Sequence, residues 1–98
     1  MGSTTFCQTV HGETAIEAFN FAQEEARYDH GHSGYTGTIA EKHDFVMIDL
    51  PEEYAKLPVK YSEKLFMDDD PRIDNKWGPA GCIDLGDSKW LFFGWASE

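Results

Sequence analysis

The chain has 98 residues, of which 41% are hydrophobic and 14% aromatic, and this composition predicts one folded domain over residues 1–98. Eighteen acidic residues against eight basic ones give a formal charge of −10, which disfavours binding to nucleic-acid polymers and to anionic membranes. No apolar run approaches the roughly 20 residues of a membrane span, and we expect a protein of the reducing cytoplasm.

The first predicted elements are a strand and a helix. Residues 5–10 are rich in β-formers, and a His-Gly pair follows them as a break. Thr14 and Glu17 form a capping box that starts a helix, which we expect to end at about residue 28. One stripe of this helix carries mostly small residues, which allow close approach to a sheet. The stripe consists of Ala15, Ala18, Phe19, Ala22 and Ala26.

The segment after this helix is the strongest candidate for a binding site. Residues 29–38 hold three glycines, two histidines and several hydroxyl groups, more hydrogen-bonding capacity than a simple connection needs. They could line a pocket for a small planar ligand such as a nucleobase, or they could form a hydrogen-bonded bend that shapes the next strands. The predicted ligand-binding residues are His30, His32, Ser33, Tyr35, Thr36 and Thr38, with Trp77 from a later loop. His30 and His32 could also reach one metal ion in an extended segment, but exposed or locally hydrogen-bonded loop histidines are the favoured interpretation, so we predict no metal site.

The middle of the chain predicts a β-hairpin and then a second helix. Residues 35–41 are rich in β-branched side chains, and residues 45–48 form the uninterrupted apolar run of a central strand. The short link between them predicts antiparallel pairing. Two prolines then predict a helical turn over residues 51–57 and a helix over about residues 59–67.

An acidic stretch ends that helix. Residues 68–70 are three consecutive aspartates, and Asp74 follows them in a loop that runs to residue 79. The spacing matches a calcium-binding loop poorly, because the glycine and final glutamate positions hold other residues. The plain interpretation is an acidic helix end exposed to solvent. Three carboxylates at the negative end of a helix dipole are nevertheless unfavourable, which hints at a cation or a basic partner.

The C-terminal part predicts a hairpin that is aromatic on both faces. Residues 81–85 and 89–96 have the pattern of strands, joined by a Gly-Asp-Ser turn. Because neither face of the last strand suits water, one face could contact a partner chain. The predicted interface residues are Trp90, Phe92 and Trp95 on this strand and Phe21 and Tyr28 on the outer side of the first helix. The last two could instead pack under a loop.

The elements follow the order strand, helix, strand, strand, helix, strand, strand. This order predicts the α+β class, with an antiparallel sheet of about five strands and two helices. The expected arrangement is ferredoxin-like, βαββαβ with one C-terminal strand added. A more open antiparallel sheet with both helices on one side is the alternative.

The two cysteines predict no chemistry. Cys7 and Cys82 form neither a zinc pattern nor a CxxC motif, and we expect both to be buried thiols in strands. Nothing in the spacing brings a histidine to Cys82. We therefore predict no catalytic residue and no cofactor, and an enzyme is the less favoured class of protein.

Two blocks of the sequence resemble small acidic accessory proteins encoded by tailed bacteriophages. They are residues 26–42, ARYDHGHSGYTGTIAEK, and residues 77–83, WGPAGCI. That group has no established activity, so the resemblance carries over no catalytic residue. It implies the cytoplasm of a host bacterium and a role in countering host defence by binding.

Three functions follow as hypotheses. The first is a non-catalytic protein that sequesters a small nucleotide-like ligand or a host factor through residues 29–38, with possible homo-oligomerisation. Phosphates would require basic side chains gathered at that site, and those available are Arg27, Lys42, Arg72 and Lys76. The second is an acidic inhibitor that blocks a host protein. The third is a metal-dependent enzyme that uses His30 and His32.

Overall fold

The computed structural model describes residues 2–30 and 36–98, except for the side chain of His30. The strands are β1 (Ser3–His11), β2 (Phe45–Met47), β3 (Ala80–Gly86) and β4 (Lys89–Ser97). The α-helices are α1 (Ala15–His30) and α2 (Pro58–Met67), and two short 3₁₀ helices are η1 (Ile39–Glu41) and η2 (Glu52–Tyr54). The chain therefore belongs to the α+β class. In the described ranges, neither α-helix combines the length and the apolar character needed to cross a membrane.

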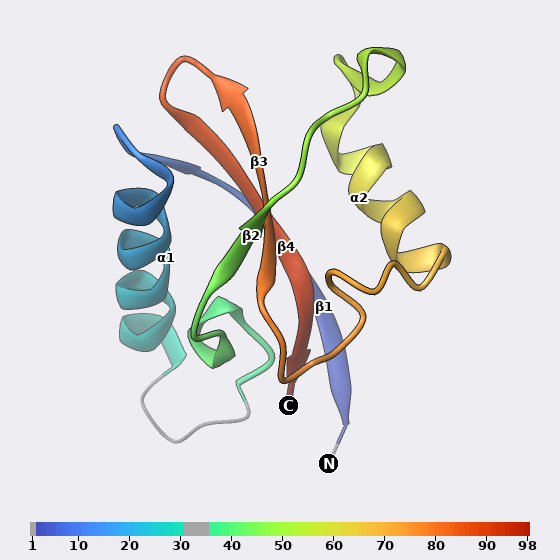
Figure 1. Cartoon of the computed structure of the whole chain (residues 1–98). Coiled ribbons are helices and arrows are strands. Elements are labelled where there is room, and N and C mark those ends of the chain that lie inside the picture. Colours follow the sequence, from blue (N-terminus) through green and yellow to red (C-terminus); the bar gives the residue numbers. More distant parts are fainter. Residues whose placement is uncertain (1, 31–35) are drawn as a thin grey trace.

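The strands form one mixed sheet in the order β1-β4-β3-β2 (Figure 1). β4 lies inside the sheet and runs antiparallel to both β1 and β3, whereas β2 runs parallel to β3. β1 pairs with β4 along its whole length, from Ser3 opposite Ser97 to His11 opposite Lys89. The two rims of the sheet therefore differ: β1 offers nine residues and β2 only three.

The two helices cover opposite faces of the sheet (Figure 1). On one face Phe19 of α1 packs against Phe92, with 5.6 Å between the ring centroids. On the other face Phe66 of α2 packs against Phe93, the next residue of β4, at 6.0 Å. Because successive side chains of a strand point to opposite faces, an apolar β4 requires cover on both sides, and the chain itself supplies it.

The expected hairpin in the middle of the chain is wrong for the described residues. Residues 39–41 form η1 instead of a strand, because the Thr38 hydroxyl accepts a hydrogen bond from the Ala40 N–H at 3.2 Å and starts the turn. Ile39 is fully buried against the α1 side of the core and anchors this turn. β2 then pairs with β3 in parallel and has no hairpin partner before it in the sequence.

These pairings also overturn the expected topology. The sheet has four strands of mixed direction, not five antiparallel ones, so the ferredoxin-like arrangement is wrong. The alternative with both helices on one side is wrong as well, because α1 and α2 lie on opposite faces. The helix predictions are confirmed: Thr14 Oγ1 accepts from the Glu17 N–H at 3.1 Å before α1, and α2 covers the range expected for the second helix.

Candidate functional site

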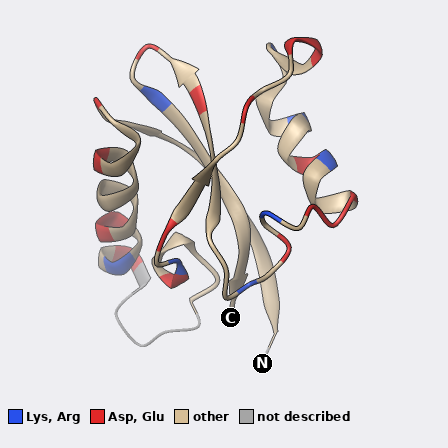
Figure 2. Ribbon diagram, in the orientation of Figure 1, with Lys and Arg blue, Asp and Glu red and all other residues tan. Residues whose placement is uncertain are grey.

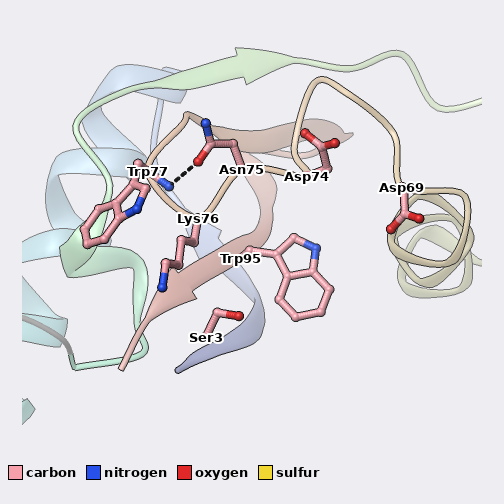
Figure 3. A pocket seen from close by; sticks show the side chains of 7 residues that line it. All are labelled: Ser3, Asp69, Asp74, Asn75, Lys76, Trp77 and Trp95. Carbon is pink, nitrogen blue, oxygen red and sulfur yellow. Dashed lines mark hydrogen bonds between the residues drawn. The ribbon is translucent and has the colours of Figure 1, made fainter. Parts of the chain in front are cut away.

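An open groove (Figure 3) lies at the end of the sheet where both chain termini are found (Figure 1). It has a volume of about 610 Å³ and lies between the start of β1, the end of β4, the C-terminal end of α2 and the loop before β3. The side chains that line it are Ser3, Asp69, Asp74, Asn75, Lys76, Trp77 and Trp95 (Figure 3). The groove therefore combines two indoles with two carboxylates and one ammonium group.

The loop before β3 is shaped by its own hydrogen bonds. Asn75 Oδ1 accepts from the Trp77 N–H at 2.8 Å, and the Asn75 carbonyl accepts from the Gly78 N–H at 2.9 Å. This Asx turn sets the direction of the backbone at Trp77. Over half of the Trp77 surface is exposed, so the indole stands at the rim of the groove.

Lys42, which directly follows η1, forms hydrogen bonds to the backbone of the same loop. Its Nζ donates to the carbonyl oxygens of Gly78 at 3.0 Å, Lys76 at 3.2 Å and Asn75 at 3.4 Å. The side chain is only 1% exposed, and this burial lowers the pKa of Lys42 to about 8. A buried ammonium group that donates to three carbonyls of one loop fixes the position of the residues that line the groove.

The acidic stretch after α2 divides into paired and unpaired carboxylates. Asp68 forms an ion pair with Lys64, one helical turn earlier. Asp70 receives two hydrogen bonds of 2.9 Å from the Arg72 guanidinium, which lowers the pKa of Asp70. Asp69 and Asp74 have no side-chain partner among the described residues, and both line the groove. The two carboxylates of this stretch without a described cation are thus the two that line the groove.

The backbone places Asp69 at the groove. Asp69 has a left-handed conformation with φ of 51°, directly after the helix cap, and the Asp70 N–H bonds to the Leu65 carbonyl at 3.0 Å. This is the geometry of a Schellman motif, in which glycine is the usual residue at the left-handed position. An aspartate there adds a carboxylate to the groove at a cost in backbone energy.

The remaining cation of the groove is Lys76. Its Nζ lies 5.3 Å from the centroid of the Trp77 ring and 3.4 Å from the Gly2 carbonyl, to which it donates. In Figure 3 the Lys76 side chain extends between the two indoles. Trp95, on the far side, packs against Phe66 of α2 with 5.7 Å between the ring centroids. The position of Lys76 therefore shows that the Trp77 ring accommodates a cation.

The predicted loop site is only partly described. Residues 31–35, with His32, Ser33 and Tyr35, lie outside the described residues, as does the side chain of His30. Thr36 and Thr38 are tied to each other and to Glu41: their hydroxyl oxygens are 2.7 Å apart, and Thr36 Oγ1 donates to Glu41 Oε2 at 2.8 Å. Neither threonine lines the groove, so the structure separates them from Trp77.

The predicted interface residues fall into two groups. Phe21 and Tyr28 are exposed on the outer side of α1, Tyr28 to 90%. Phe92 is fully buried between α1 and the sheet, so a partner chain cannot reach it in this fold. Trp90 is partly buried on the same face and donates to the Gly12 carbonyl at 2.8 Å, whereas Trp95 lines the groove.

The cysteines differ from each other. Cys82 is fully buried, as predicted, and burial raises the pKa of its thiol to about 12. The prediction of burial is wrong for Cys7, which is exposed on the rim strand β1 and has its Sγ 3.7 Å from the Ser62 hydroxyl. Within residues 2–30 and 36–98, no three His, Cys, Asp or Glu side chains come together as metal ligands.

Sequence reasoning missed part of the groove. It identified Trp77 and the acidic stretch separately, but Ser3 and Trp95 come from opposite ends of the chain and only the sheet register brings them together. One local signal was present in the sequence. Lys64 lies four residues before Asp68, and Arg72 lies two residues after Asp70, which leaves Asp69 without a nearby base. Comparisons with protein-family models, with curated proteins and with solved structures found no match for this chain.

Proposed function

We propose that this protein is a non-catalytic binding protein that uses the groove to hold a basic segment of another protein. The observation that supports this most directly is that Asp69 and Asp74, two carboxylates without a described cation, line the same groove as the exposed indole of Trp77. Carboxylates and indole faces are the groups that recognise arginine and lysine side chains. The net charge of −10 would also attract a basic protein over a distance.

A nucleotide fits the described site less well, because the bases needed for its phosphates are dispersed. Lys42 is buried and donates to three backbone carbonyls, and Arg72 is held by Asp70. Arg27 lies on α1 and is absent from the groove lining, so Lys76 is the one base among the described residues that line it. Of the hypotheses from the sequence, the acidic inhibitor of a protein is thus favoured over sequestration of a nucleotide. The resemblance to phage accessory proteins would make the partner a host protein.

The test compares two variants of equal net charge. Asp69→Asn/Asp74→Asn removes two charges from the groove, and Glu24→Gln/Glu25→Gln removes two exposed charges from α1, a helix on which Figure 2 shows several acidic positions. The probe is a labelled peptide of alternating arginine and glycine, with affinity measured by fluorescence anisotropy. We expect the groove variant to weaken binding about tenfold, and the α1 variant to weaken it less than about threefold. Equal losses would mean that only the net charge attracts the peptide.

A second measurement separates the two ligand classes. Trp77→Ala should weaken the same peptide several-fold, because the exposed indole face is lost. ATP should give no thermal stabilisation of the wild type at concentrations at which the peptide stabilises it. If ATP raises the Tm of the Asp69→Asn/Asp74→Asn variant as it does that of the wild type, the proposal is contradicted. The ligand site would then be expected at residues 29–38 instead.

A further inference from the structure

We propose that β1 is the interface of a homodimer, in which β1 of one copy pairs antiparallel with β1 of a second copy. The sheet would then continue across the interface. This inference concerns the rim of the sheet, which the groove does not use, apart from Ser3 at the start of the strand. It is independent of the proposed binding of a basic partner.

The register of β1 shows which of its backbone groups point away from the sheet. At one end the Glu98 N–H donates to the Gly2 carbonyl at 3.2 Å, and at the other the Gly12 N–H donates to the Ser88 carbonyl at 3.0 Å. In an antiparallel pair, hydrogen-bonded residues alternate with residues whose N–H and C=O point outward. The even-numbered residues of β1 therefore bond to β4. The outward residues are Ser3, Thr5, Cys7, Thr9 and His11.

This rim lacks the features that usually prevent pairing. β1 is nine residues long, contains no proline and no lysine, and pairs with β4 without a bulge. A long regular rim of this kind is a template for another strand. The opposite rim, β2, has only three residues, so it offers far less to a partner.

β1 is complementary to itself in one full-length register. A two-fold axis at Cys7, the middle residue, places Ser3 opposite His11 of the second copy and Thr5 opposite Thr9. Outward residues then meet outward residues throughout. Five outward residues in each copy, each with one N–H and one C=O, allow about ten hydrogen bonds, which is typical of a specific protein interface. A shift of the register by one residue would place outward-pointing backbone groups of one copy opposite inward-pointing groups of the other, and all of these hydrogen bonds would be lost.

Charge favours a second copy over a foreign basic strand as the occupant. β1 contains no Asp or Glu, so a basic peptide would gain no ion pair within the strand, whereas an uncharged strand opposes itself without repulsion. The alternation of side chains between the two faces of the sheet also matches across the two copies of β1. On the α1 side Phe6 would lie opposite Gln8 of the second copy, and Val10 opposite Thr4. The net charge of −10 on each copy opposes association at long range, and salt screens that repulsion.

The first experiment measures the dimer dissociation constant of the full chain by analytical ultracentrifugation. Thr5→Pro removes an outward N–H that the intramolecular sheet does not use, and Thr5→Ala is its matched control. We expect Thr5→Pro to weaken the dimer at least about tenfold and Thr5→Ala to weaken it less than about threefold. Thr9→Lys, which keeps its N–H and adds a charge to the same rim, should weaken the dimer as well, even if the proline variant folds poorly.

The second experiment uses Cys7 as a probe. Cys82 is fully buried, so a short bis-maleimide on the native protein can link only Cys7, and the proposed axis places the two Cys7 residues opposite each other. We expect a covalent dimer from the wild type and from Thr5→Ala. Cys7→Ser should give none, and Thr5→Pro should give much less.

Two outcomes would overturn the proposal. One is a wild type that is monomeric up to millimolar concentration, which would leave the rim for a foreign strand. The other is a dimer that Phe21→Ser or Tyr28→Ser breaks and Thr5→Pro does not, which would place the interface on α1. Added salt should strengthen the dimer and weaken binding of the arginine peptide. A failure of one proposal is therefore distinguishable from a failure of the other.

Discussion

The Nζ of Lys42 lies 3.0 Å from the carbonyl oxygen of Gly78, a residue 36 positions later in the chain. This contact joins the turn after the predicted ligand loop to the loop that carries Trp77. It also explains why a charged residue occupies a position that is 1% exposed: the ammonium group is satisfied by three carbonyls rather than by a carboxylate. Lys42 therefore acts as an internal support for the groove and is not available to a ligand.

Lys42 predicts a specific pH dependence of stability. The pKa of Lys42 is about 8 in the folded chain and has its ordinary value of 10.5 when the chain is unfolded. Between these values the unfolded state binds more protons, so the free energy of unfolding rises with pH. Relative to Lys42→Met, which lacks this titration, we expect wild-type stability to increase by roughly 2–3 kcal/mol from pH 7 to pH 10. Urea unfolding of both proteins at several pH values measures the difference.

The comparison with Lys42→Met removes the contributions of other groups that titrate in the same range. Parallel curves for the two proteins would mean that Lys42 is solvated in the folded state. If the free energies of unfolding of the two proteins instead diverged below pH 7, the lowered pKa of Lys42 in the folded state would be contradicted.

Asp69 predicts a trade between stability and binding. Its φ of 51° favours glycine, so Asp69→Gly should stabilise the fold by about 0.5–1 kcal/mol while removing one carboxylate from the groove. Thermal unfolding should show a higher Tm, and the arginine peptide should bind several-fold more weakly. Asp69→Asn, which tolerates the same backbone, should lose binding with little gain in stability. A variant Asp69→Gly that binds as well as the wild type would exclude Asp69 from the site.

Local patterns predicted the helices and the last hairpin, because each is specified by neighbouring residues. Thr14 caps the first helix within one turn, and the turn at Asp87 and Ser88 has positive φ at both residues, as a tight hairpin requires. The prediction that the last strand is apolar on both faces is confirmed for β4. What the pattern could not show was that α1 and α2 would each cover one of these faces, so it suggested a partner chain where the fold places a helix.

The prediction of a hairpin in the middle of the chain was wrong for a different reason. Ile39 looks like a strand residue, but the Thr38 hydroxyl and the Glu41 carboxylate provide local acceptors that stabilise a turn. The groove was beyond local reasoning because its lining joins Ser3 to Trp95 through the sheet register. Asp69 and Trp77 could be identified from the sequence as unusual, but not as residues that line one groove.

Two strand glycines predict opposite results for the same substitution. A Cβ on Gly81 would lie 2.7 Å from Cζ of Phe93, whereas the nearest contact of a Cβ on Gly94 is 3.4 Å, with the Phe6 ring. Gly81→Ala should therefore destabilise the fold by about 1–3 kcal/mol, because the ring between the sheet and α2 must move. Gly94→Ala should be neutral or slightly stabilising. Denaturant unfolding of both variants tests this, and equal effects would contradict the packing of Phe93 over Gly81.

Two buried serines predict opposite changes in the free energy of unfolding when each is replaced by alanine. The Ser62 hydroxyl donates to the Val59 carbonyl at 2.6 Å, whereas the Ser97 hydroxyl is buried and has no hydrogen-bond partner among the described residues. Removing a satisfied hydroxyl loses a hydrogen bond, and removing an unsatisfied one relieves a desolvation cost. We expect Ser62→Ala to lower the free energy of unfolding by about 1 kcal/mol and Ser97→Ala to raise it by up to about 1 kcal/mol. Urea unfolding at one pH is sufficient, and a clear loss of stability in Ser97→Ala would show that this hydroxyl does have a partner.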